Sequence, residues 1–307
     1  MSTLTQNIKN QAKELGFELV GIAPADPHAH LSFFDQWLAK GYAGTMNYLE
    51  RGGDKRADPK RILEGAKTLI CCGLNYYRGQ PKSLENVDPE RGWISRYAWG
   101  DDYHDIFLEK LKLLENFIRK EKPDVQMKSY VDTGPILERS YAESAGLGWI
   151  GKNTLLLNQN IGSYFFLGEI ITNLPLEVDA PTNDHCGTCT RCIDACPTQA
   201  LTPYELDATK CISYLTIEHR GAIKEEFRDK IGHHLVGCDI CQEVCPWNRD
   251  PPIATEKRFD PRPGNFNPLL KELSSLSPEE FSNRFRKSPI KRVKWEGLQR
   301  NIKRISP

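Results

Sequence analysis

Ten cysteines lie in this chain of 307 residues, and the spacing of eight of them restricts its fold more than any other feature. The first four of these eight spell C-x2-C-x2-C-x3-C-P, and they are Cys186, Cys189, Cys192 and Cys196. In such a run three thiolates bind one four-iron cluster, and the fourth binds a neighbouring cluster. The run therefore predicts a pair of clusters rather than one.

The second half of the pattern comes about forty residues later, as C-x2-C-x3-C-P. It lacks the first cysteine of the earlier run, and Cys211 can supply the missing thiolate. Crossed ligation then uses all eight thiolates. The first cluster takes Cys186, Cys189, Cys192 and Cys245, and the second takes Cys196, Cys211, Cys238 and Cys241.

Zinc is the alternative reading of clustered cysteines, because four thiolates from paired C-x2-C knuckles bind a single zinc ion. A triple run that ends in Cys-Pro, matched by a second Cys-Pro, favours iron-sulfur clusters instead. Cys71 and Cys72 are different, since they lie in the apolar run TLICCGL. We expect them to be plain core residues.

The overall charge by itself indicates neither a nucleic-acid nor a membrane partner, because Lys plus Arg and Asp plus Glu number 41 each. The N-terminus carries lysines and amides where a signal peptide needs an apolar run, and no stretch approaches the roughly 18 apolar residues of a membrane span. We expect a soluble, cytoplasmic protein without a membrane partner. In that reducing compartment cysteines serve metal ligation more often than disulfides.

Helix and strand patterns alternate through about residue 175 and predict an α/β or α+β domain with a central sheet over residues 1–175. A cysteine-dense stretch then predicts a second, ferredoxin-like domain over residues 176–250. Residues 251–307 read as a Pro-rich linker followed by a basic helical segment. That segment, 281–307, holds nine Lys or Arg and one acid, and its charge fits either a solvated surface helix or phosphate contacts.

Three further motifs carry weaker signals. The glycines of G-x-G-x-x-G at 146–151 follow a predicted helix rather than a strand, so nucleotide binding is not expected there. The acidic cluster 101–105 precedes an amphipathic helix and is read as an N-terminal cap. Its Asp102-Tyr103-His104 begins like D-x-H-x-x-G, a cobalamin motif, but Phe107 replaces the glycine, so no histidine ligand to cobalt is expected. Asp132 follows a predicted strand, where a cap, an Asx-turn and a catalytic role all stay open.

A two-cluster electron carrier needs only about a quarter of this length, which leaves the N-terminal domain to hold the acceptor chemistry. The chain closely resembles the epoxyqueuosine reductase family from about residue 1 to residue 250. The motifs that carry this resemblance are RADPKRIL, RYAWGDDYHD, YVDTGPILERSYAESAGLGWIGKN, GSYFFLGEIITNLPLE, CGTCTRCIDACPTQAL, KCISYLTIEHRG and GCDICQEVCPWN.

The resemblance implies a cobalamin-binding N-terminal domain and two 4Fe-4S clusters. It implies an enzyme that reduces epoxyqueuosine at the wobble position of tRNA to queuosine, with cob(II)alamin reduced to cob(I)alamin by the clusters. Asp132 would be the proton donor, with a pKa raised by burial beside the corrin. The residues implied as corrin or nucleotide-tail contacts are Arg56, Tyr103, Asp132, Lys152, Asn153 and Ser213.

The implied partners are tRNA containing epoxyqueuosine and a low-potential electron donor such as ferredoxin or flavodoxin, with the enzyme a monomer. Many family members continue into helical HEAT-like repeats, and here we expect the basic segment to supply some of the tRNA contacts. Two alternatives stay open. One is a reductive dehalogenase, which normally carries a twin-arginine export signal that this N-terminus lacks, and the other is an electron-transfer protein without its own substrate.

Overall fold

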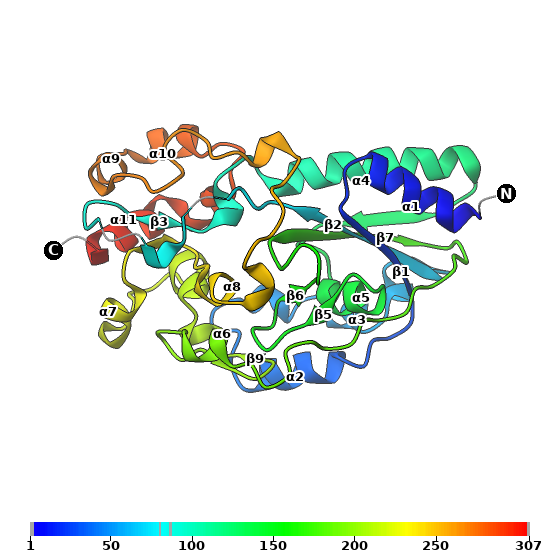
Figure 1. Cartoon of the computed structure of the whole chain (residues 1–307), viewed down its shortest axis with the longest axis horizontal. Coiled ribbons are helices and arrows are strands. Elements are labelled where there is room, and N and C mark those ends of the chain that lie inside the picture. The colour runs from blue at the N-terminus through cyan, green and yellow to red at the C-terminus, as the bar shows by residue number, and fades with distance from the viewer. Residues whose placement is uncertain (1–2, 80, 86–87, 306–307) are drawn as a thin grey trace.

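A four-stranded sheet is the centre of the fold in the computed structural model, which describes residues 3–79, 81–85 and 88–305 (Figure 1). The strand order is β1-β2-β7-β4, and every neighbouring pair is antiparallel. The strands are β1 (Leu19–Pro24), β2 (Thr68–Asn75), β7 (Phe165–Thr172) and β4 (Met127–Tyr130). The predicted central sheet is thus confirmed, and its antiparallel order makes the domain α+β.

Helices cover both faces of this sheet. Helices α1 (Leu4–Glu14) and α4 (Tyr103–Glu121) lie on one face, and α5 (Glu138–Ser144) lies on the other (Figure 1). Strand β2 is buried along its whole length, so alternate residues enter opposite cores. Cys72 joins the α1 and α4 side while Cys71 joins the α5 side, and both are core residues as predicted.

The cysteine-dense region consists of short helices and turns beside the sheet domain. Its main elements are α6 (Arg191–Asp194), α7 (Arg228–Ile231), α8 (Ile240–Glu243) and a π-helical turn, η6 (Tyr214–Glu218). A cluster of apolar side chains that includes Ile212 and Ile240 supports these turns from within. Cys192 lies in α6 and Cys241 in α8, while the other six cysteines of the pattern lie outside helices and strands, where backbone can wrap a compact cofactor.

The C-terminal segment is helical, as expected, and its helices pack onto the rest of the chain. The stretch 251–269 runs along the first domain, where Asn75 Nδ2 donates to the carbonyl of Pro252 and Phe259 enters the sheet core. Helix α11 (Lys294–Ile305) shares a third core with Trp93 and Trp99. The last two residues of the basic segment lie outside the described ranges.

The remaining elements are short. No helix in the ranges that the structure describes combines the length and the apolar character needed to cross a bilayer. The other helices are α2 (Leu31–Ala39), α3 (Gly53–Ala57), α9 (Leu270–Ser274) and α10 (Pro278–Arg284), and the other strands are β3 (Trp93–Ile94), β5 (Trp149–Ile150), β6 (Leu156–Leu157), β8 (Leu201–Thr202), β9 (Glu205–Leu206) and β10 (His234–Val236).

Candidate active site and cysteine sites

Asp132 lies on an exposed loop directly after strand β4. Its backbone has a φ of 58°, a left-handed conformation that aspartate tolerates better than most residues. The backbone N–H of Asp132 donates to Oε1 of Glu138, at 2.5 Å, which fixes the turn from the first residue of α5. The side chain of Asp132 is 61% exposed and is therefore available to a ligand.

His104 lies between two carboxylates. Its Nδ1 is 2.7 Å from Oδ1 of Asp102, and its Nε2 is 3.5 Å from Oδ2 of Asp132. Asp102 also caps α4 by accepting the backbone N–H of His104, so the predicted cap is confirmed. The cap therefore also orients the imidazole toward the Asp132 loop.

The charges around His104 shift the pKa values of His104 and Asp132 in opposite directions. Burial alone would lower the pKa of His104, but Asp102 and Asp132 raise it to about 9. The interaction with His104 in turn lowers the pKa of Asp132. In the ligand-free protein the interaction with His104 outweighs the effect of burial on Asp132, and the raised pKa expected beside a bound corrin stays a prediction. At neutral pH the proton resides on the imidazole.

A second carboxyl pair lies beneath the Asp132 loop. Glu169 on β7 is 2% exposed, and its Oε1 has no hydrogen-bond partner within the described part of the chain. Burial and the charge of Asp132 raise the pKa of Glu138 to about 8. Burial and the charge of Glu138 raise the pKa of Glu169 as well. The pair thus retains a proton at neutral pH.

Stacked aromatic rings lie beside Asp132. Tyr103 stacks on Phe166 with ring centroids 4.1 Å apart and planes within 2°, and it also stacks on His104 at 4.1 Å. Tyr97 meets Tyr103 edge-on. Tyr103 therefore lies between the rings of Phe166 and His104, and this aromatic stack borders the exposed carboxylate of Asp132.

A cation and a tyrosine border the same site. Arg292 binds both carboxylate oxygens of Glu218 at 2.8 and 3.0 Å, and its guanidinium lies 5.4 Å from the ring centre of Tyr48. The charge of Arg292 contributes to the lowered pKa of Asp132, which places the two near each other. The basic segment thus reaches the site through Arg292.

Four of the predicted cluster ligands surround one cavity of about 220 Å3, namely Cys186, Cys189, Cys192 and Cys245. In the second set, electrostatic interactions join Cys241 to Cys211 and Cys196, and Cys238 to Cys241 and Cys211. Both groups match the crossed assignment, which stays a prediction, since Cys241 also interacts with Cys192 of the first group. Across the described residues no set of three or more His, Cys, Asp or Glu is arranged for a single metal ion. Thiolates spread around a cavity fit a four-iron cube, whose corners each take one ligand.

The other predicted contact residues fall in three places. Tyr103 lies beside Asp132, as described above. Lys152 Nζ donates to the carbonyls of Gly187 and Cys189, and Asn153 Nδ2 donates to the carbonyl of Cys241, so both brace the cysteine loops. Ser213 begins the turn η6, between Cys211 and Glu218.

Arg56 is buried and binds the backbone of a neighbouring loop. Its Nη1 donates to the carbonyl of Leu49 at 2.8 Å, and its guanidinium stacks on Phe34. It therefore holds the loop that presents Tyr48, which is an indirect contribution to the site.

Sequence reasoning assigned no role in the site to several residues that the fold brings to Asp132. These are Tyr48, His104, Glu138, Glu169, Glu218 and Arg292. His104 and Glu138 lie within two of the sequence motifs quoted above. The polar residues of those motifs were the signal that could have found them. Tyr48, Glu169 and Arg292 come from distant segments, and their sequence context carries no such signal.

Comparisons with known proteins agree with this arrangement. A family model described as "Epoxyqueuosine reductase QueG, DUF1730" matches residues 56–133, and one described as "4Fe-4S double cluster binding domain" matches residues 185–248. A curated epoxyqueuosine reductase of Leadbetterella byssophila is 44% identical over 304 residues, covering 98% of each chain. One of Pseudomonas aeruginosa is 44% identical over 97% of this chain and 84% of its own.

Solved structures of such reductases match as well. The crystal structure of an epoxyqueuosine reductase with an epoxyqueuosine-modified tRNA stem loop has a TM-score of 0.88 and 38% identity, over 97% of this chain and 80% of that one. A Bacillus subtilis reductase, described with its catalytic loop swung out of the active site, has a TM-score of 0.88 and 37% identity over the same shares.

Proposed function

Because this chain belongs to the epoxyqueuosine reductase family, we propose that it reduces the epoxide of epoxyqueuosine in tRNA, at the wobble position, to the alkene of queuosine. The observation that carries the proposal is the exposed carboxylate of Asp132, which lies next to the imidazolium of His104 and its aromatic stack. This site lies in the same chain as two groups of four cysteines. A substrate-free electron carrier would leave it without a use.

The reaction consumes two electrons and two protons and releases the epoxide oxygen as water. The chain's own residues can supply the protons in a defined order. His104 holds a proton at neutral pH and contacts Asp132, so it can protonate this carboxylate when substrate displaces water. Asp132 then donates that proton to the oxygen that leaves carbon.

The carboxyl pair of Glu138 and Glu169 provides a further proton close to the loop. Glu138 accepts a hydrogen bond from the backbone N–H of Asp132, so the protonated carboxyl pair and the proposed proton donor are in direct contact. Burial raises the pKa of Glu138 to about 8 and raises that of Glu169 as well, which keeps a proton on the pair at neutral pH.

We propose that cobalamin binds beside Asp132 and Tyr103, without a histidine ligand to its cobalt. There it would contact the substrate. When bound, it supplies a strongly reducing and nucleophilic cobalt centre. His104 is held between two aspartates and is not free to ligate it. Thiolates of the two cysteine groups would hold clusters that accept electrons singly from a low-potential carrier such as ferredoxin or flavodoxin.

We also propose that the enzyme acts as a monomer in the cytoplasm and that Arg292 meets the anticodon. Arg292 is exposed and borders Asp132. Its guanidinium donates to Glu218 through Nε and Nη2 and lies against the ring of Tyr48. Such an ordered cation suits contact with phosphate or a flat base.

The direct test is conversion of the modified nucleoside. Protein purified without oxygen, loaded with iron, sulfide and hydroxocobalamin, is mixed with epoxyqueuosine tRNA and dithionite. We expect liquid chromatography of the digested tRNA to show queuosine. Loaded protein that leaves epoxyqueuosine intact while a known family member converts it would refute the proposal.

A further inference from the structure

A basic cavity borders the first group of cysteines. It has a volume of about 620 Å3, and Cys245 lies in its wall. The lining side chains also include Leu84, which is 56% exposed, and Pro246. A cavity that reaches a predicted cluster ligand lets an outside molecule approach that cluster.

Three cations surround this cavity, namely Lys82, Arg191 and Arg249. All three are exposed, and none of their side chains forms an ion pair with another residue that the structure describes. The exposed acid in the lining is Asp194, which accepts a hydrogen bond from Thr190. The surface around Cys245 is therefore positive while the chain as a whole has no net charge.

The rim of the cavity is firmly built. Glu243 in α8 accepts the backbone N–H of Ser83 at 2.7 Å and its hydroxyl at 2.5 Å. Arg96 lies 3.6 Å from the same carboxylate, so this buried acid is compensated and does not cancel the surface cations. These bonds fix η3 (Ser83–Glu85), and with it Lys82 and Leu84, against α8.

The cysteines connect the cavity to the segment that reaches the substrate site. Cys245 lines the cavity, and charge interactions link the first group to the second through Cys192 and Cys241. Cys211 of the second group leads into η6, whose Glu218 binds Arg292 near Asp132. Electrons that enter at the cavity would therefore pass from the first cluster to the second, which adjoins that turn.

We propose that this cavity, with Lys82, Arg191 and Arg249 on its rim, is the docking surface for an acidic one-electron carrier protein. The carrier loses one electron to the adjacent cluster, and no bond or proton changes at the surface. Two such encounters supply the two electrons of one turnover. The proposal rests on the proposed function only for the use of those electrons.

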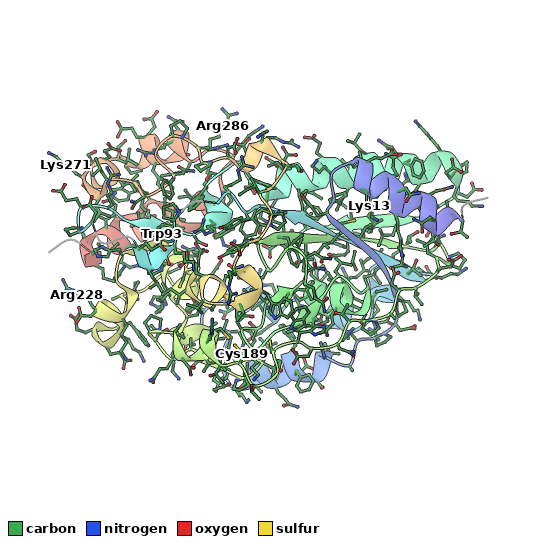
Figure 2. The ribbon with its side chains drawn as sticks, viewed as in Figure 1. Lys13, Trp93, Cys189, Arg228, Lys271 and Arg286 are labelled. Atoms are coloured by element: carbon green, nitrogen blue, oxygen red, sulfur yellow. The ribbon has the colours of Figure 1, made fainter. Side chains whose placement is uncertain are left out.

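Charge reversal tests the surface. We avoid Arg191, which adjoins Cys192, and combine Lys82→Glu with Arg249→Glu in cluster-loaded protein. The matched control is Lys271→Glu, an exposed lysine on α9 that Figure 2 shows far from Cys189. The probe is an acidic, FMN-loaded flavodoxin, titrated at low and high salt. Iron content is measured first, to establish that the clusters are intact.

We expect the double variant to raise the Kd for flavodoxin roughly tenfold at low salt and to flatten its salt dependence, because rim charges steer association. Lys271→Glu should leave the Kd within about twofold of the parent. An unchanged Kd in the double variant overturns the proposal. So does a selective loss of affinity for an anticodon stem loop, which would make the surface a nucleic-acid contact.

Turnover of the unaltered enzyme with dithionite needs no carrier, so it tests the proposed function separately. If dithionite yields no queuosine while flavodoxin binding still depends on Lys82 and Arg249, the docking surface stands and only the reaction assigned to it fails.

Discussion

At the scale of single residues, Asp132 combines a strained backbone with an exposed carboxylate, and this combination makes it the best candidate for proton delivery. Replacement Asp132→Asn keeps the size of the side chain and removes its proton. We expect turnover to fall by about 10² to 10⁴, the usual contribution of a general acid. Product formation is measured by chromatography, with iron content and stem-loop affinity as controls that should not change. A rate within a few-fold of the parent would remove this role.

His104 makes stability depend on pH in a defined window. Its pKa rises from 6.5 to about 9 in the folded protein, so its ion pairs stabilise fully below about pH 6.5 and are lost as pH rises through 9. His104→Asn should therefore lower the free energy of unfolding by roughly 1 to 3 kcal/mol at pH 6.5 and much less at pH 9.5. Thermal unfolding across this range measures the difference. An equal loss at both pH values would contradict the assignment.

At the scale of elements, the helix α11 acts mainly as a structural brace. Asn301 is fully buried, and its Nδ2 donates to the carbonyls of Thr216 and Leu235, both at 2.8 Å. Arg300 donates to the carbonyls of Leu215, His219 and Gly221. Much of the basic charge thus binds backbone around η6, which the excess of Lys and Arg alone could not reveal.

Replacement Asn301→Ala leaves two buried carbonyls without a donor. We expect it to cost about 2 to 4 kcal/mol of unfolding free energy, since each unsatisfied group costs about 1 to 3. Lys303→Ala, on an exposed position of the same helix, serves as the control and should cost less than about 0.5 kcal/mol. Urea denaturation compares the two, and equal midpoints would show that α11 does not brace the turn.

Patterns within a single segment predicted the helices and strands well. The sheet order and the contacts between distant segments could not be predicted in this way. The periodic residues of α1 and α4 and the apolar run of β2 predict helices and a buried strand, because these signals lie within one element. The antiparallel order of the sheet depends on connections that no local pattern encodes. The same holds for the approach of Arg292 to Asp132, which joins segments 160 residues apart along the chain.

At the scale of the whole molecule, crossed ligation would tie the end of the cysteine region back to its beginning. The cavity that Cys245 shares with Cys186, Cys189 and Cys192 joins α8 to the loop before α6. Each thiolate holds one iron corner, so loss of one ligand is expected to destroy one cluster and spare the other. The two groups can therefore be told apart by removing one cysteine at a time.

We expect Cys245→Ser to lower the iron content of reconstituted protein from about eight to about four per chain, and Cys211→Ser to do the same through the other cluster. Cys71→Ala, in the apolar core, should leave about eight, because that thiol takes no part in ligation. Iron assay and electron paramagnetic resonance of the reduced proteins make the measurement. The two serine variants should each lose a different signal, since different clusters survive. Loss of the same signal in both variants would mean that Cys245 and Cys211 serve one cluster, and the crossed assignment would then be wrong.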